Sequence, residues 1–361
     1  MALADNETVN VQARGATNEW GNRHDQENEM MKLWSFLFIG LTFLSFTHAA
    51  RAEKLPPPGS GQSFKDCPEC PEMVVVPAGS FMMGSTESEI RYLIKRYDAH
   101  RFENEGPRHK VTISKPFAVG RTHVTRGEFA QFVKGTGYDT TGGCYTVVSN
   151  EGKITADASW KNPGFEQTDD HPALCLNLND ANAYINWLNE KVPEKPYRLL
   201  SEAEAEYVTR AVTKPGIYPP FSFGNDERDL CKYGNGLDQT FKASGNQPSA
   251  WPYLACHDGY TFTAPVGSFK PNAWGVYDVL GNAWTWTQDC WTPDYKDAPK
   301  DGSAQTSVDC KYHILRGGSW DEGPQNLRAA NRGSIGSEIR NHWIGFRVAR
   351  TITPLALVDE K

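Results

Sequence analysis

A short stretch near the carboxyl end gathers side chains that could move protons or hold anions. Ser319, Asp321 and Glu322 lie almost side by side, and two arginines follow them. Asp321 or Glu322 could take a proton from a substrate, whereas Arg328 or Arg332 could hold a carboxylate. A serine without an evident base beside it is not a nucleophile by itself. The stretch therefore indicates acid–base chemistry more than covalent catalysis.

These residues define the candidate site. The catalytic candidates are Ser319, Asp321 and Glu322, and the substrate-binding candidates are Trp320, Asn326, Arg328 and Arg332. A competing interpretation is that most of them are loop and strand-edge residues whose polar groups are satisfied within the fold. A pocket normally uses few polar groups, so we expect only about three of them to touch a ligand.

The elements that position this stretch are predicted to be short strands. Residues 284–286 read Trp-Thr-Trp, and residues 315–320 read Leu-Arg-Gly-Gly-Ser-Trp. Aromatic and β-branched residues suit a half-buried pleated surface, and glycine permits the corners between strands. Little of residues 275–350 has a helical pattern.

Upstream, the patterns predict both strands and helices. Residues 73–84 read as a strand, a turn and a second strand, and an alternating strand follows near residues 109–113. Thr125 with Glu128, and Ser201 with Glu204, have the spacing of capping boxes that open helices. A further helix is expected to begin near Asn179 or Asp180, and residues 221–263 are rich in loop-forming residues.

Composition limits the class of protein. The chain has 361 residues, 39% of them hydrophobic, which is enough for a sizeable core. The net charge of −7 argues against a binder of nucleic acid, because such binding needs clustered Lys and Arg. Aromatic residues make up 12% of the chain and there are 32 glycines, so short elements anchored by aromatic side chains are expected.

The amino-terminal segment predicts export. An apolar run over residues 33–46 follows Met30 and Met31, and Ala50-Arg51-Ala52 resembles a cleavage signal. We interpret residues 1–52 as a signal-peptide region with its true start at Met30 or Met31. The alternative, a membrane anchor, is disfavoured because the run is too short to span a bilayer, so no stable membrane span is expected. A periplasmic or extracellular location follows.

The rest of the chain divides into three predicted parts. Residues 53–66 contain Pro-Pro-Pro-Gly and are expected to be a linker, residues 67–350 the folded domain, and residues 351–361 a tail.

Eight cysteines follow the predicted cleavage site, and an even number in an exported chain indicates disulfides. From loop closure, the expected pairs are Cys67–Cys70, Cys144–Cys175, Cys231–Cys256 and Cys290–Cys310. The alternative is a reactive or metal-binding role for the Cys67-x-x-Cys70 motif or for Cys290 and Cys310, but exported cysteines are usually paired.

Three motifs together resemble the formylglycine-generating enzyme family, also called sulfatase-modifying factors. They are Gly-Asn-Ala-Trp-Thr-Trp at residues 281–286, Arg-Gly-Gly-Ser-Trp at residues 316–320 and Gly-Phe-Arg at residues 345–347. The resemblance covers about residues 73–350. It implies a single α+β domain with little regular secondary structure and a C-type-lectin-like fold, and it makes residues 73–84 the opening hairpin.

The resemblance also raises a chemical difference. Family oxidases bind copper(I) through two cysteines, and those two positions fall at Glu322 and Leu327 here. Copper is not expected, because neither side chain replaces a thiolate. Relatives that use iron take histidines from an additional helical domain. The nine histidines of this chain have no paired spacing, so the sequence does not support an iron site and leaves iron open.

Calcium is the cofactor that the resemblance does imply, in a structural role. The first family site falls on Asn246, the carbonyl of Gln247, Asp258 and the carbonyl of Tyr260. The alternative is that Asp258 simply belongs to a turn. A second site falls on Asp278 and the carbonyls of Gly281 and Ala283, but Thr285 replaces a glutamate, so this site is expected to be weak or empty.

The leading hypothesis is an exported, oxidoreductase-like maturation enzyme that acts on a peptide or peptide-derived substrate without the copper site. Exported relatives that lack the cysteines include the protein that matures the pyoverdine chromophore, which offers an analogy only. The alternative is a non-catalytic, calcium-stabilised binding module of the same fold. The sequence leaves the oligomeric state open.

Overall fold

The core of the fold is a sheet that joins distant parts of the chain. The computed structural model describes residues 55–148, 151–212, 214, 216–245 and 252–352. Its largest sheet has the strand order β1-β2-β5-β13-β8, formed by Ser63–Phe64, Met73–Val76, Phe117–Gly120, Val348–Thr351 and Tyr197–Leu199. All of its pairs are antiparallel. The last described strand, β13, therefore lies between β5 and β8, which come from much earlier in the chain.

A second sheet carries the motifs of the carboxyl-terminal stretch. Its order is β11-β10-β9-β12, formed by Arg332–Gly336, Tyr312–Arg316, Trp284–Cys290 and Ile344–Gly345. The short strands expected from the aromatic and glycine pattern are confirmed. Two further pairs complete the strands: β3 (Gly79–Met83) with β4 (His109–Ile113), and β6 (Cys144–Val148) with β7 (Glu151–Thr155).

The opening strands do not form the expected hairpin. The strand, turn and strand are present as β2 and β3, but β2 pairs with β1 and β5, whereas β3 pairs with β4. Residues of β2 are buried throughout and those of β3 only in part. A strand buried on both faces needs a partner on each side, so β2 is better placed in the interior of the larger sheet.

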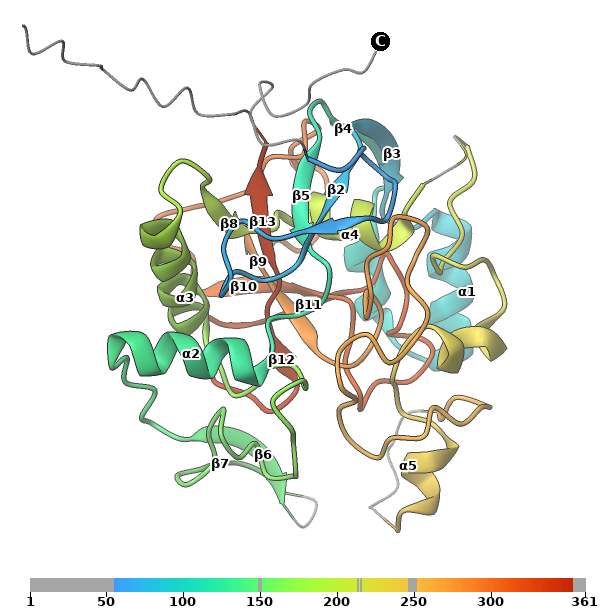
Figure 1. The fold of residues 1–361 in the computed structure, drawn as a ribbon. Coiled ribbons are helices and arrows are strands. Elements are labelled where there is room, and N and C mark those ends of the chain that lie inside the picture. Colours follow the sequence, from blue (N-terminus) through green and yellow to red (C-terminus); the bar gives the residue numbers. More distant parts are fainter. Residues whose placement is uncertain (1–54, 149–150, 213, 215, 246–251, 353–361) are drawn as a thin grey trace, which may run out of the picture. The chain divides into compact units, whose positions relative to one another are not determined.

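Helices surround the two sheets. They are α1 (Glu87–Tyr97), α2 (Arg126–Thr136), α3 (Leu178–Lys191), α4 (Glu202–Arg210) and α5 (Gln239–Ala243), with 3-10 helices η1 (His100–Glu105) and η2 (Glu227–Lys232). Figure 1 shows α2 and α3 together on one side of the sheets and α1 and α5 on the other. The predicted capping boxes of α2 and α4 at Thr125 and Ser201 are confirmed. The cap of α3 is Asn177, two residues before the expected start.

The packed interior and the disulfides join these layers. Two large clusters of buried apolar side chains lie on the two faces of the first sheet, because Val75 and Ala118 belong to one cluster, and Val74 and Val119 to the other. All four expected disulfides are present, so no cysteine of the chain is free.

Within the part of the chain that the structure describes, no helix is long and apolar enough to cross a bilayer. The predicted signal-peptide region and the tail beyond residue 352 lie outside those residues.

Candidate functional site

The loop between β10 and β11 carries the candidate site, and Arg316 holds it in place. The Arg316 guanidinium is buried, and it donates to the carbonyls of Ala329 at 2.7 Å and Ala330 at 3.2 Å. Its charge is balanced by Glu206 of α4, at 2.5 Å. The arginine of the Arg-Gly-Gly-Ser motif thus links the start of the loop to its end.

Gly318 allows the turn that follows. Its φ is +78°, and a Cβ at this position would meet Leu327 Cδ2 at 2.6 Å. A larger residue would therefore be strained and would clash within the loop. The turn brings Ser319 inward, where it is 0% exposed.

Ser319 has a carboxylate partner that the sequence did not make evident. Its hydroxyl donates to Oδ1 of Asp321. Burial raises the pKa of Asp321, and the hydrogen bond from Ser319 partly opposes that rise. Because the carboxylate accepts the serine proton, the pair can lower the cost of removing it.

Glu322 is the residue best placed for acid–base chemistry. Trp284 Nε1 donates to its Oε1 at 3.3 Å, and the Asn326 amide donates to its Oε2. Burial raises the pKa of Glu322 to about 7, and the nearby Asp321 carboxyl adds to the rise. A group with such a pKa has both protonation states populated near neutral pH.

Arg101 completes this cluster and was missed by sequence reasoning. It comes from η1, and its Nη2 donates to Oδ1 of Asn326 at 2.5 Å. Its positive charge also acts on Glu322, where it favours the ionised carboxylate. Nothing local in the sequence points to this contact, because the two segments are far apart along the chain.

The two arginines proposed to bind substrate have partners within the protein. Arg328 forms a two-pronged pair with Glu105, at 2.9 and 2.5 Å. Arg332 pairs with Glu202 at 2.7 and 3.1 Å. Both arginines are buried, so each stands in the structure as the partner of an internal carboxylate. Their contact with a substrate stays a prediction.

Trp320 separates the acid cluster from an aromatic wall. Phe165 stacks on Phe262 with ring centroids 4.5 Å apart, and Trp320 meets their edges at 5.5 and 5.2 Å. His342 packs on Trp320 at 5.5 Å. Burial lowers the pKa of His342 to about 4, so this ring is neutral at pH 7.

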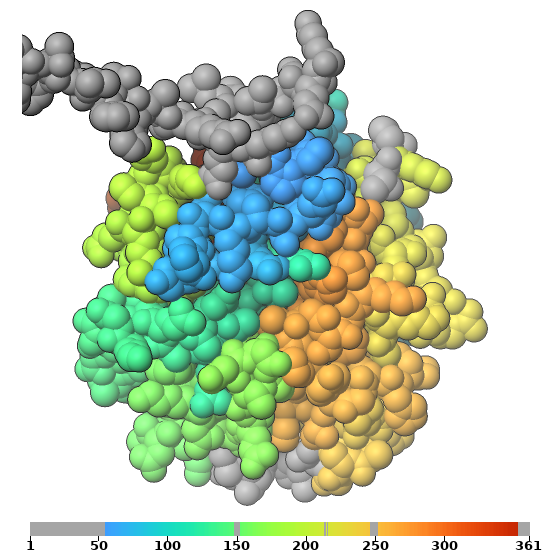
Figure 2. Space-filling view, viewed as in Figure 1, coloured from blue at the N-terminus to red at the C-terminus, as the bar shows by residue number. Residues whose placement is uncertain are grey.

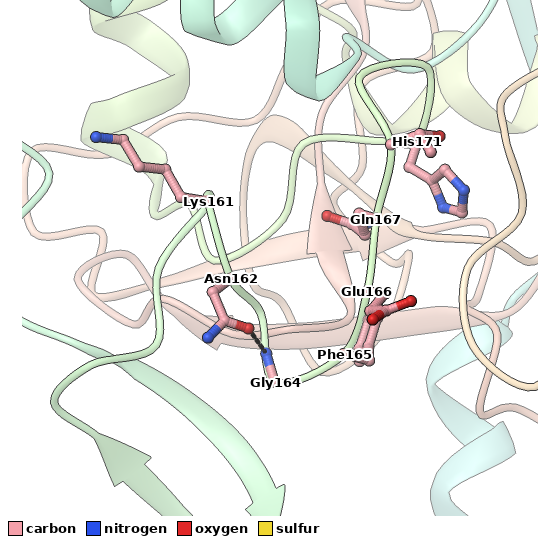
Figure 3. A pocket seen from close by; sticks show the side chains of 8 residues that line it. Lys161, Asn162, Gly164, Phe165, Glu166, Gln167 and His171 are labelled. Carbon is pink, nitrogen blue, oxygen red and sulfur yellow. Dashed lines mark hydrogen bonds between the residues drawn. The ribbon is translucent and has the colours of Figure 1, made fainter.

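A cleft of about 660 Å³ opens beside this wall. Residues of the 161–171 loop line it, among them Lys161, Phe165, Gln167 and His171 (Figure 3). In the space-filling view, the green segment that contains this loop adjoins the orange segment that follows residue 252 (Figure 2). The backbone bond from Val266 N to the Asp170 carbonyl, 2.8 Å, joins the two segments. A cleft of this size suits a small ligand or a short stretch of peptide.

The residues of the first expected calcium site are only partly described, because Asn246 and Gln247 lie outside the described residues. Asp258 lies beside Asp238, with carboxylate oxygens within 4.8 Å, and burial raises the pKa of Asp258 to about 7. Cys231, the third nearby group, is tied up in a disulfide. Two adjacent carboxylates repel each other without a cation, so Asp258 fits a calcium ligand.

The second expected calcium site fits less well. Asp278 is 2% exposed, and its Oδ1 has no partner among the described residues. However, the Arg347 guanidinium already donates to the Asp278 carbonyl at 3.2 Å, and the Thr285 hydroxyl is 2.8 Å from His123 Nε2. With Thr285 in place of a glutamate, Asp278 is the one carboxylate of the expected ligand set, which is little charge for calcium.

The two positions that correspond to copper-binding cysteines have different surroundings. Glu322 lies in the acid cluster, whereas Leu327 is 0% exposed in the apolar core. Since all eight cysteine sulfurs are in disulfides, the chain offers no thiolate pair for a copper ion.

Comparison with known proteins gives a consistent picture. Residues 60–352 match the family model described as the sulfatase-modifying factor enzyme 1-like domain. The formylglycine-generating enzyme of Thermomonospora curvata is 32% identical over 254 residues, which cover 62% of this chain and 73% of the relative. The inactive C-alpha-formylglycine-generating enzyme 2 of Bos taurus is 27% identical over 314 residues, which cover 77% and 87%.

Among solved structures, PvdO from Pseudomonas aeruginosa is similar with a TM-score of 0.65 and 40% sequence identity. The match covers 82% of this chain and 100% of PvdO. The expectation of one domain of mixed helices and sheets, with the fold that these relatives share, is confirmed.

Proposed function

Since the chain belongs to the family of sulfatase-modifying factor enzyme 1-like domains, we propose that it is an oxidoreductase-like maturation enzyme for a peptide or peptide-derived substrate. In this proposal Glu322 takes a proton from the substrate as a base, and the two electrons of the oxidised bond pass to an external acceptor such as molecular oxygen, which also takes up the proton. Ser319 and Asp321 form the polar floor beside it, and Trp320 separates them from the aromatic wall.

The position and environment of Glu322 carry the proposal. The carboxyl replaces a metal-binding thiolate of the family and is held by Trp284 and Asn326. A carboxyl held between two donors has a fixed orientation, which acid–base catalysis requires. In this proposal Glu322 transfers protons at the position where the cysteine-containing members of the family would bind copper.

Export to an oxidising compartment is part of the same proposal. Four disulfides in one domain support it, because such bonds persist outside the reducing cytoplasm. The sequence pattern of residues 1–52 supports it independently.

The test uses a strain that lacks the gene, complemented with the wild type or with Glu322→Gln. Glutamine keeps the shape of the side chain but cannot exchange a proton at neutral pH. We expect peptide-derived products that depend on the wild type to be missing with Glu322→Gln, as measured by untargeted mass spectrometry of exported material. Glu190→Gln, on the exposed face of α3, is the matched control and should restore the products. Equal product profiles for wild type and Glu322→Gln would remove Glu322 from the mechanism.

A second candidate is a non-catalytic binding module of the same fold. Two observations favour it. Leu327, at one of the two positions of the copper-binding cysteines, is buried and has no reactive group, and the chain is similar to an inactive family member. If no product depends on the wild type, yet the purified protein retains a peptide-derived compound from the same extract, this second function is the better one.

A further inference from the structure

Three arginines lie near the acid cluster, and they differ in exposure. Arg328 and Arg332, which the sequence indicated as carboxylate binders, are both buried, and each is paired with a glutamate of the protein. The charge of each is therefore matched inside the fold. Arg101 of η1 is exposed. Of these three arginines, it is the one that a ligand can reach from solvent.

Two contacts place the Arg101 guanidinium beside Glu322. Its carbon lies 5.1 Å from the centroid of the Phe102 ring, and its Nη2 donates to Oδ1 of Asn326 at 2.5 Å. Because Oδ1 accepts from Arg101, the other end of the Asn326 amide is the donor, and Nδ2 donates to Oε2 of Glu322. Arg101 and Glu322 thus bind the two ends of one amide group.

The charges around Arg101 allow an anion to bind there. Glu322, Glu105 and Arg328 are the charged groups that act on it. Glu105 and Arg328 form a two-pronged pair, so their charges offset each other. The pKa of Glu322 is raised to about 7, so this carboxyl is protonated in a large fraction of molecules at neutral pH. In those molecules Glu322 does not balance the Arg101 charge, and an anion of a ligand can do so.

We propose that Arg101 binds a carboxylate of the substrate, next to the bond from which Glu322 removes a proton. A guanidinium holds a carboxylate through two parallel hydrogen bonds, which fixes orientation as well as position. The bound anion also strengthens Glu322 as a base, because a like charge nearby favours its protonated form. This inference rests on the proposed function, since it names a group that the peptide-derived substrate of Glu322 carries.

The probe is N-acetylglycylglycine, a small peptide with a free carboxylate, and its neutral counterpart is N-acetylglycylglycinamide. Both are titrated into the full mature chain at pH 6 and followed by saturation-transfer NMR. The wild type should bind the acid up to about fivefold more tightly than the amide, as expected for an exposed ion pair. Arg101→Gln should remove that difference. The matched control, Arg91→Gln, removes an exposed arginine of α1 and should keep it.

The groups that face Glu322 determine how binding should depend on pH. Arg101 of η1 stays charged at all pH values used, and Trp284 of β9 and Asn326 do not titrate. Asp321 is the neighbouring carboxyl, and burial raises its pKa as well. Of these groups, Glu322 and Asp321 are therefore the ones that can gain negative charge as the pH rises.

A pH series tests whether the bound carboxylate lies beside Glu322. An ionised Glu322 repels it, so the wild type should bind the acid several-fold less tightly at pH 8 than at pH 6. Glu322→Gln should still prefer the acid to the amide through Arg101, but it should lose most of this pH dependence. The remainder comes from Asp321.

Three results would overturn the inference: no saturable binding of the acid, equal binding of acid and amide, or the same preference in Arg101→Gln as in the wild type. A pH dependence that Glu322→Gln leaves unchanged would also overturn it, because the anion would then lie elsewhere. If the exported products persist with Glu322→Gln but the acid preference depends on Arg101, only the proposed function fails. If the products disappear but acid and amide bind equally, only the carboxylate site fails.

Discussion

At the scale of single residues, the proposed function depends mainly on Glu322, at a position where the resemblance to the family implies a cysteine. A thiolate and a carboxylate differ in metal preference, but both are bases. Here burial and the neighbouring Asp321 carboxyl raise the pKa of the Glu322 carboxyl to about 7, although the donors Trp284 and Asn326 oppose that rise. The same loop can then support proton transfer where a metal ligand would otherwise stand.

Glu322 predicts a pH dependence of activity. If the ionised carboxylate is the base, kcat/KM should rise with pH by about tenfold per unit below about 7 and then level off. The measurement is a pH–rate profile on the product identified by mass spectrometry. An activity that falls as pH rises through 7 would instead make Glu322 a general acid.

The same pKa predicts a stability change of defined sign. The pKa of Glu322 is raised from 4.5 to about 7 in the folded state, so the folded chain holds a proton that the unfolded chain releases. The free energy of unfolding should therefore fall as pH rises from about 4.5 through about 7. Urea denaturation should show a smaller fall for Glu322→Gln, with a remainder of the same sign from Asp321, whose pKa is also raised.

The sequence indicates the residues of the site that are close to Glu322 along the chain, but not those that come from distant segments. Ser319, Asp321, Glu322 and Asn326 are close in sequence, so composition alone drew attention to them, and the structure links them in hydrogen-bonded pairs. Arg101 comes from a distant segment, and only tertiary packing brings it to the site. Trp284 lies in a predicted strand and is buried, and its indole N–H also donates to Glu322, a contact that the sequence pattern does not indicate.

At the scale of elements, buried ion pairs fix the loop that carries the site. Glu206 of α4 accepts from Arg316, from Arg210 and from the backbone N–H of Gly84. Arg316 in turn binds the far end of the site loop. The position of α4 is thus coupled to the geometry of Ser319 and Glu322 through Glu206 and through Glu202, which contacts Arg316 and Arg332.

Glu206→Gln should be strongly destabilising. It leaves the buried Arg316 charge without its nearest carboxylate, and such a loss typically costs about 3–5 kcal/mol. The matched control is Glu87→Gln on α1. The Glu87 carboxyl pairs with Arg91 at the surface and is exposed, so the loss of unfolding free energy should stay below about 1 kcal/mol. Urea unfolding at neutral pH measures both variants. Similar losses for the two would show that the α4 pair does not hold the loop.

Local signals predicted some elements and not others. The capping boxes at Thr125 and Ser201 predict α2 and α4, and Thr86 with Glu89 has the same spacing at the start of α1. The pattern of residues 73–84 also predicts the two strands β2 and β3. The pairing partners of β2 and β3 could not be predicted in this way, because β2 pairs with β5 more than forty residues away and β3 pairs with β4 more than twenty-five residues away.

At the scale of the whole molecule, the chain has few long elements and relies on links between loops. Loop closure was enough to predict all four disulfides, because each joins cysteines that are neighbours in the sequence order of cysteines. Calcium would be a further link, between the segment after α5 and the Asp258 turn. The adjacent Asp238 and Asp258 carboxylates are the described residues that favour it.

We propose that a single structural calcium ion is bound at Asp258 and none at Asp278. Removing calcium with a chelator should lower the thermal midpoint by a few degrees, since a ligand at a hundred times its Kd stabilises by about 2.7 kcal/mol. Calcium, but not magnesium, should restore the midpoint, because the smaller ion demands stricter octahedral geometry. Circular dichroism follows the unfolding, and elemental mass spectrometry counts the bound ion.

Two variants decide which loop binds the ion. Asp258→Asn should abolish both the bound calcium and the effect of the chelator, whereas Asp278→Asn should keep both, because Arg347 already supplies positive charge beside Asp278. The opposite pattern would place the ion in the loop of residues 278–285. Calcium would then bind although Thr285 stands in place of the family glutamate. The hydrogen bond between Thr285 and His123 would not prevent this binding.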